Sequence, residues 1–358
     1  MKNYKKYSVL LLFLLFTACK NDKKSIFIES NKINSFFETY FNDKVDRSPM
    51  YQARLGIKKD YDKWDDISPK SDTLELKIAK DALQWIKDSI NVSLLNDQSK
   101  LSYRLFKQSL ENQIKDFKYR LHNYPLNQMY GYHSRVPAFL INIHKVDAKK
   151  DAEDYIARLI AIKYFFNQLE KNLIERELVG IMPPKFVYHH VIDDSKNIIS
   201  GLPFNGTDSS ALFKDIVGKI GALNLEKSEQ KRLNKQAKNA LIFSVLPAYQ
   251  SLINFLEKQM INSTEDDGVW KWPNGDKFYS NALKRTTTTD MTTEEIHQLG
   301  LTEVERIHKE MVKIKDKVGF KGNLKSFFDE LKSNEKYYYP QSESGKRDYM
   351  IRASQIIE

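Results

Sequence analysis

Apolar residues recur every three or four positions over long stretches of the chain, which is the spacing of one face of a helix. One such stretch runs from Asp151 to Leu178, and its apolar positions are Tyr155, Leu159, Ile162, Phe166, Leu169 and Leu173. Glu153 and Asp154 lie in its first turn, where negative charge interacts favourably with the helix dipole. The pattern predicts one long helix with a buried face.

A second stretch, Ser228 to Met260, has the same period. Its apolar stripe consists of Leu233, Ala237, Leu241, Leu252 and Leu256. Pro247 interrupts this stretch, and proline lacks an amide hydrogen and clashes with the preceding helical turn. We therefore expect Pro247 to kink or divide the helix.

Few signals for turns or strands accompany these helices. The chain has 13 glycines and 10 prolines among 358 residues, and no run of alternating apolar and polar residues. Trp270 to Tyr279 contains a Pro-Asn-Gly turn between aromatic residues, so we expect a small hairpin or loop there. The sequence predicts an all-α fold with a single large helical domain.

Residues 286–301 read TTTTDMTTEEIHQLGL. Thr292 and Glu295 have the spacing of a capping box, in which the two side chains satisfy free amides at a helix start. Gly300 can end that helix in a left-handed conformation. Thr302 and Glu305 repeat the capping box, so the pattern predicts a helix, a glycine turn and a second helix.

The four threonines before this helix, Thr286 to Thr289, are β-branched, which favours an extended backbone. An extended polar segment beside a helix N-terminus suits the wall of a cleft that binds a peptide backbone or an anion. A solvated loop explains the same residues, and the local sequence does not separate the two interpretations.

The N-terminus has the pattern of a secretory signal. Positive residues precede a short apolar run, Ser8 to Phe16, and then Thr17, Ala18 and Cys19. The run is too short to span a membrane. A small residue before a lone cysteine resembles a bacterial lipobox, although Phe16 stands where leucine is usual. We predict a signal peptide over residues 1–19, a lipid on Cys19 and a linker over 20–29; ordinary cleavage near Ala18 is the alternative.

Charge and cysteine content limit which binding partners and which disulfides we expect. Lys and Arg number 57 against 47 Asp and Glu, giving a net charge of +10. The charges are interspersed and an exported protein has little access to nucleic acid, so we expect a basic surface and no nucleic-acid partner. Cys19 is the only cysteine, which excludes an internal disulfide. The predicted location is the cell envelope, with the lipid as the membrane anchor.

The region around the threonines also carries a family resemblance. Its matching residues are Tyr279, Leu283, Arg285, Thr286–Asp290 and Glu294–Met311. Supporting segments are Phe36–Gly56, Pro137–Asp147, Asp151–Leu159 and Ile181–Val187. From about residue 30 to its end, the chain resembles the DUF885 family of bacterial proteins, which are often lipoproteins.

The resemblance implies an α-helical relative of zinc peptidases. Family members carry a His-Glu-x-x-Pro-Gly-His-His segment downstream of the threonine motif, and such a segment can hold zinc and an activated water. The threonine motif then lines a cleft for a peptide substrate. The cleft residues so implied are Tyr279, Arg285, Thr287, Thr288 and His297.

The chain departs from the family in one large respect. None of its seven histidines is followed by glutamate, so the metal-binding segment is missing. The final segment, from Lys346, has a helical pattern without a stop signal. We therefore expect residues 30–358 to be the N-terminal portion of a longer helical domain, truncated at its C-terminus. That portion would have no catalytic residue or metal of its own, with zinc expected only in full-length members.

Two other groups of residues contain possible metal ligands. Glu294 with His297 and Glu305 with His308 have the Glu-x-x-His spacing of di-metal helical bundles. In one straight helix these pairs are 11 residues apart, about 16 Å, which is too far to share ions. His189-His190 with Asp193-Asp194 has suitable residue types but no recognised spacing, and we expect it to end a helix begun near Pro184.

Two functions remain open from the sequence. The first is an exported lipoprotein that resembles a zinc-dependent peptidase and is inactive without its metal-binding segment. The second is a non-catalytic helical surface lipoprotein that binds a peptide, a glycan or a protein partner. The 19 tyrosines and 20 phenylalanines suit the second function, although aromatic cores also use them.

Overall fold

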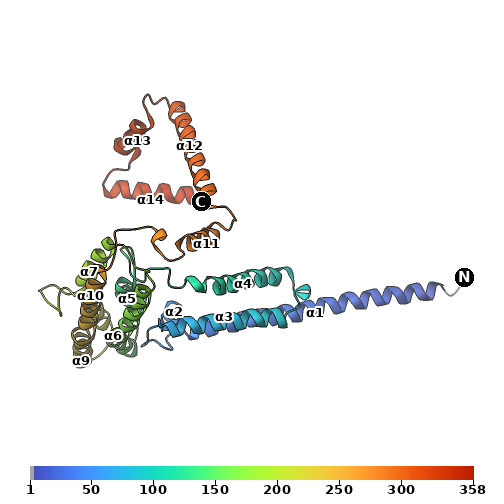
Figure 1. Ribbon diagram of the computed structural model, residues 1–358, viewed down its shortest axis with the longest axis horizontal. Helices are drawn as coiled ribbons and strands as arrows, with labels where there is room; N and C mark the ends of the chain where they lie inside the picture. The colour runs from blue at the N-terminus through green and yellow to red at the C-terminus, as the bar shows by residue number, and fades with distance from the viewer. Residues whose placement is uncertain (1–3) are drawn as a thin grey trace. The chain divides into compact units, whose positions relative to one another are not determined.

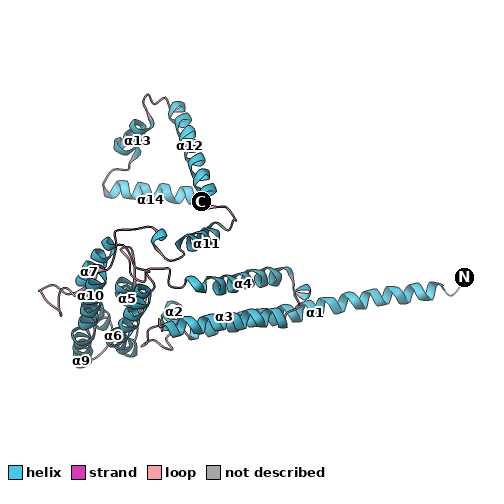
Figure 2. Ribbon diagram, viewed as in Figure 1, coloured by secondary structure: helices cyan, strands magenta, loops and turns pink. Residues whose placement is uncertain are grey.

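The computed structural model describes the backbone of residues 4–358 and the side chains from residue 23 onward. The described chain is built from helices, and its extended pairing is limited to two isolated bridges, Leu126 with Gly131 and Leu202 with Ser209 (Figure 2). The all-α prediction is confirmed. The contacts divide the chain into two compact units, Met1–Gly275 and Asp276–Glu358, where we expected one continuous domain.

The first unit opens with a group of helices that pack along α1 (Figure 1). Its elements are α1 (Tyr4–Asp46), α2 (Pro49–Arg54), α3 (Pro69–Ser89), η1 (Val92–Leu94), α4 (Asp97–Asp116) and η2 (Phe117–Tyr119). Ile33, Ile86 and Leu110 are buried between α1, α3 and α4. Phe36 stacks on Trp85 with ring centroids 4.0 Å apart. Apolar and aromatic packing therefore joins these three helices.

The predicted linker and lipid site lie in α1. Residues 20–29 continue this helix and do not form a separate linker. The side chain of Cys19 lies outside the described side chains, so its lipidation stays a prediction.

The larger part of the first unit surrounds α6. It contains α5 (Tyr132–Asn142), α6 (Lys149–Leu178), α7 (Lys185–Ile198), α8 (Ala211–Gly221), α9 (Lys227–Ala240), the π-helical turn η3 (Leu241–Val245), α10 (Leu246–Ile261) and η4 (Val269–Lys271). Helix α6 packs against α8, α9, η3 and α10. All six apolar positions predicted on its buried face are at most 5 % exposed, so the predicted face forms the core.

Pro247 divides the second predicted helix as expected. The π-helical turn η3 ends two residues before Pro247, so the hydrogen-bond ladder changes where proline lacks a donor. The five apolar positions of the predicted stripe are buried. Among the described residues, one stretch, Lys227–Ile261, is long and apolar enough to cross a membrane. Its packing in the core of the first unit accounts for that composition.

A buried arginine joins α6 to the irregular segment between α2 and α3. Arg158 is fully buried, and its Nε donates to the carbonyl of Lys63 at 3.0 Å. Its guanidinium carbon lies 5.0 Å from the ring centroid of Tyr61 and 4.8 Å from that of Phe139. Burial lowers the pKa of Arg158 to about 10, so it is cationic at neutral pH. Aromatic faces and carbonyl oxygens stabilise this cation.

Arg158 also determines the tautomer of His144. One guanidinium nitrogen of Arg158 lies 2.9 Å from Nδ1 of His144 and can only donate, so Nδ1 accepts. Nε2 of His144 then carries the proton and donates to the carbonyl of Asp151 at 2.9 Å. Burial, together with the Arg158 charge, lowers the pKa of His144 to about 3. The imidazole is therefore neutral in the folded protein.

The second unit holds the threonine motif. Its elements are α11 (Gly275–Thr287), α12 (Thr293–Lys317), α13 (Leu324–Ser333), η5 (Glu335–Tyr337) and α14 (Glu343–Ile357). Phe327 of α13 is buried against Phe320, with ring centroids 5.2 Å apart. Several apolar residues of α12, among them Val304, Ile307 and Ile314, are exposed. The unit therefore has a small core and a largely uncovered α12.

The buried neutral His144 predicts a pH-dependent stability. Below pH 6.5 the unfolded chain takes up a proton on His144 while the folded chain does not, so the free energy of unfolding falls. With pKa values of about 6.5 and about 3, the loss by pH 5 is about 2 kcal/mol. Urea titrations at pH 7 and pH 5 measure it. His144→Gln should lose about 2 kcal/mol less than the unmodified chain; equal losses would contradict the neutral assignment.

Candidate ligand-binding cavity

The first unit contains a polar cavity of about 390 Å³. Its walls come from the start of α3, the connection between α4 and α5, the first turns of α5, and the last turns of α6. The charged residues lining it are Asp66, Asp72, Arg120, Arg135 and Arg176. This volume falls in the usual range for small-molecule sites, roughly 300 to 1,000 Å³.

Helix α6 positions the wall that leads into α3. Gln168 accepts a hydrogen bond from the backbone amide of Ile67 at 3.1 Å and donates to Asp66 at 3.0 Å. Asn172 donates to the carbonyl of Ile67 at 2.5 Å. These bonds hold the segment that precedes Pro69, where α3 begins, and so place Asp72 in the first turn of α3 at the cavity.

Arg176 is fixed at the floor of the cavity by two asparagines. Its Nε and one terminal nitrogen donate to the Asn123 side chain at 3.2 and 2.8 Å. The other terminal nitrogen donates to the carbonyl of Asn172 at 3.0 Å. Burial lowers the pKa of Arg176, while the nearby Asp72 acts in the opposite direction. No carboxylate among the described residues forms an ion pair with this guanidinium, and Arg176 lines the cavity.

Two further charged groups at the wall differ in how they are held. Arg120 pairs with Glu175 at 3.1 Å. In the described part of the chain, the Asp72 carboxylate has neither a hydrogen-bond partner nor an ion-pair partner. Burial raises the pKa of Asp72, and Arg176 and Arg120 offset part of that rise. Asp72 is therefore a half-buried acid beside cations that it does not touch.

Helix α5 contributes Tyr132 and Arg135. The guanidinium carbon of Arg135 lies 5.8 Å from the centroid of the Tyr132 ring, and Arg135 is exposed. Burial raises the pKa of Tyr132, so its hydroxyl remains a donor. Gly131, just before α5, allows the chain to turn here, because a Cβ at this position would lie 2.8 Å from the Cα of Leu126.

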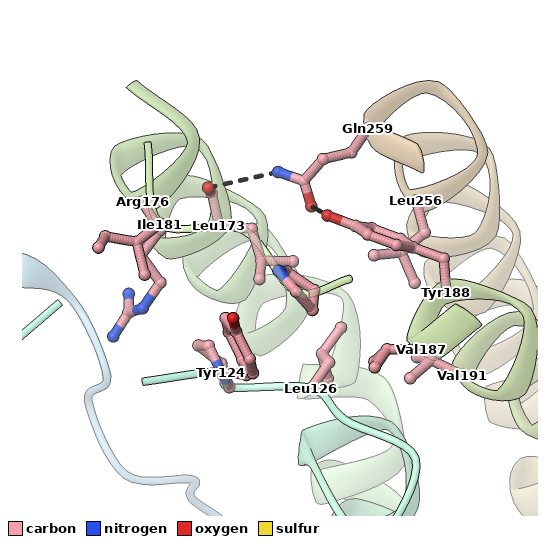
Figure 3. Close-up of a pocket in the computed structure, with 12 residues that line it drawn as sticks. Tyr124, Leu126, Leu173, Arg176, Ile181, Val187, Tyr188, Val191, Leu256 and Gln259 are labelled. Carbon is pink, nitrogen blue, oxygen red and sulfur yellow. Dashed lines mark hydrogen bonds between the residues drawn. The ribbon is translucent and has the colours of Figure 1, made fainter. Parts of the chain in front are cut away.

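An apolar pocket lies on the other side of the wall formed by Tyr124, Pro125 and Arg176. Figure 3 shows Arg176 directed away from the apolar side chains there. The Tyr188 hydroxyl donates to Gln259, and Gln259 donates to the carbonyl of Leu173 (Figure 3). The pocket encloses about 10 Å³, which is room for one water molecule at most. It is packed core, and the polar cavity is the candidate site.

The residues predicted from the threonine motif belong to the second unit, and they are not among the residues that line this cavity. Thr286 and Thr287 are not extended: they form the last turn of α11, and the Thr287 hydroxyl donates to the carbonyl of Leu283 at 2.9 Å. Thr288 has a φ of 56° and ends the helix. The extended prediction was wrong because bonding within the helix satisfies the threonine hydroxyl. Tyr279 and Arg285 lie on the same helix.

The helix that follows also differs from the prediction. The capping box of Thr292 and Glu295 is confirmed, with the two reciprocal hydrogen bonds present. However, α12 continues through Gly300, and the Thr302 hydroxyl bonds within the helix to the carbonyl of Gln298 at 2.9 Å. The predicted glycine turn and second cap are therefore wrong, because one glycine costs a helix only about 1 kcal/mol.

His297 was predicted to face a groove, but its side chain is exposed on α12. Since α12 is one helix, the two Glu-x-x-His pairs stay apart as the straight-helix alternative required. His189 and His190 are exposed within α7, which begins after Pro184 as expected. The helix continues to Ile198, so the expectation that this segment ends it was wrong. In the described part of the chain, no three His, Cys, Asp or Glu residues come together as a metal site would need.

One family of bacterial proteins matches most of the chain. The sequence profile described as "Bacterial protein of unknown function (DUF885)" matches residues 49–358. The chain belongs to the DUF885 family. No curated protein matches the sequence significantly.

Two solved structures resemble this DUF885 chain. A protein from Colwellia psychrerythraea, described as a putative lipoprotein, has a TM-score of 0.77 and 19% identity; the match covers 92% of this chain and 58% of that one. A putative lipoprotein of unknown function from Shewanella oneidensis has a TM-score of 0.56 and 15% identity, over 78% and 47%. Such likeness shows a shared helical fold. The chain spans about half the length of these structures.

The continuous α12 predicts that Gly300→Ala stabilises this DUF885 protein. A Cβ at Gly300 would meet no atom within 4 Å and the residue lies in a helix, so alanine should add roughly 0.5 to 1 kcal/mol. Urea denaturation, followed through the unfolding transition of the second unit, measures the change in the free energy of unfolding. A glycine turn would give the opposite sign, because alanine is strained in a left-handed conformation.

Proposed function

We propose that this chain is the substrate-binding portion of an exported, lipid-anchored DUF885 protein related to zinc-dependent peptidases, and that it binds a peptide without cleaving it. The polar cavity of the first unit is the observation that carries the proposal. At the floor of the cavity, hydrogen bonds to two asparagines hold Arg176 in place, and Asp72 and Arg135 place charged groups at its wall. Such convergent polar groups in a concave site are typical of ligand recognition.

Zinc chemistry would require residues outside this set. A catalytic zinc needs three protein ligands and an open fourth position. The described residues do not fit that need, because no three candidate ligands come together. We therefore assign binding to this chain, and assign any hydrolysis to the His-Glu-x-x-Pro-Gly-His-His segment that the family resemblance implies for full-length members.

A second candidate is a non-catalytic helical surface lipoprotein that binds a peptide, a glycan or a protein partner. The exposed tyrosines of the second unit favour it. Tyr338 and Tyr339 are exposed before α14, and Tyr339 packs edge-on to Tyr349 with centroids 5.8 Å apart. Exposed aromatic rings with polar hydroxyls are common in interfaces.

Lipid anchoring is supported by the signal pattern around Cys19 and by the two similar structures, which are both described as putative lipoproteins. We expect Cys19→Ser to abolish incorporation of radiolabelled palmitate, because the thiol is the site of acylation. Labelling of the unmodified chain and the variant in parallel is the measurement. Equal labelling of both would exclude the anchor.

The binding assignment predicts a chain that binds peptides but does not hydrolyse them. We expect the full chain, purified in detergent and dialysed after incubation with zinc, to hold less than one zinc per chain by metal analysis and to leave a mixed peptide library intact by mass spectrometry. The same library should show retention of peptides in equilibrium dialysis. One tightly held zinc per chain, lost together with cleavage in His297→Ala, would overturn the assignment.

A further inference from the structure

The cavity presents charges of both signs that nothing else in the described chain satisfies. Asp72 and Arg135 both line it, and neither side chain has a hydrogen-bond or ion-pair partner among the residues described. The Tyr132 hydroxyl, at the same wall, is also without a partner there. A half-buried carboxylate without a partner is costly, since it has lost part of its hydration.

Neighbouring residues hold the cations apart from Asp72. Arg176 is buried, and its guanidinium donates to Asn123 and Asn172 and not to Asp72. Arg120 is held by Glu175 at 3.1 Å. Asp72 itself is placed by the segment that α6 holds through Gln168. The acid and the cations therefore remain separate, and a ligand can reach each of them.

Complementarity then specifies the ligand. The half-buried acid favours a cationic donor, and the guanidinium of Arg135 can bind an anion with two oxygens, such as a carboxylate. The Tyr132 hydroxyl can donate to the same anion or to an amide carbonyl. A cavity of about 390 Å³ accommodates a molecule of the size of a dipeptide or tripeptide.

We propose that the cavity binds a short peptide with both ends free, its terminal ammonium at Asp72 and its terminal carboxylate at Arg135. This inference rests on the proposed function, which supplies the peptide, and adds that the free ends are what the site recognises. Arg176 is a positioning residue that contributes positive potential at the floor. A longer peptide chain without both ends in the cavity would lose one of the two charge contacts.

Three peptides of one backbone test the proposal. Ala-Ala has both ends free, N-acetyl-Ala-Ala lacks the ammonium, and Ala-Ala amide lacks the carboxylate. Isothermal titration calorimetry of the full chain in detergent should show Ala-Ala binding about tenfold more tightly than either blocked peptide, as expected when a charge-assisted hydrogen bond is lost.

Two variants test which residue binds which end of the peptide. Asp72→Asn should weaken Ala-Ala and Ala-Ala amide but leave N-acetyl-Ala-Ala unchanged, because that peptide has no ammonium to lose. Arg135→Gln should weaken Ala-Ala and N-acetyl-Ala-Ala but leave Ala-Ala amide unchanged. Asp193→Asn and Arg104→Gln are matched controls, since both residues are exposed in the first unit outside the cavity, and should bind as the unmodified chain does.

Three other results would contradict recognition of the peptide ends. Equal binding of the three peptides would overturn recognition of the ends and leave peptide binding itself intact. No binding of any of them, nor of the mixed peptide library, would overturn both the inference and the proposed function. Uniform weakening of all three peptides by either variant would also overturn the inference, because it would indicate a change in the shape of the cavity.

Discussion

A buried arginine on one helix organises the first unit. Arg158 has no carboxylate partner among the described side chains, and its charge is met by the carbonyl of Lys63, the imidazole of His144 and the faces of three aromatic rings. Removing such a cation leaves buried acceptors unsatisfied, and keeping it requires those groups to stay in place. The arginine therefore fixes the irregular segment before α3 against α6.

The same helix forms the cavity at its other end. Arg176 follows Arg158 by 18 residues, which is five helical turns, so both arginines lie on one face. Gln168 and Asn172 lie between them and hold Ile67 through its amide and its carbonyl. One polar row thus positions the chain that leads to Asp72 and also supplies the floor of the cavity. Hydrogen bonds from α6 therefore hold the irregular segment that leads into α3 in place at the cavity.

Local patterns predicted the helices but not the cavity. The period of Leu159, Ile162 and Leu169 placed the buried face of α6, and Pro247 marked the break in the next long helix. Gly300 and Thr286 both lie within helices, although the sequence predicted a turn at Gly300 and an extended backbone at Thr286. The energies that favour a turn or an extended segment at these positions are small, so the helices continue through both residues. The cavity instead depends on contacts far apart in the sequence, between α3, α5 and α6. One local signal was available: Asn172 and Arg176 are polar residues at core spacing on an otherwise apolar face, and polar groups there need partners when buried. No pattern within the sequence indicated that Asp72 and Arg135 would meet the same cavity.

Recognition of both ends of a short peptide by this cavity is the central claim. A crystal structure of the full chain with saturating Ala-Ala tests it most directly. We expect electron density for the peptide in the cavity, with its ammonium at the Asp72 carboxylate and its carboxylate at the Arg135 guanidinium. An empty cavity, with the peptide bound along α11 or α12 instead, would contradict the claim.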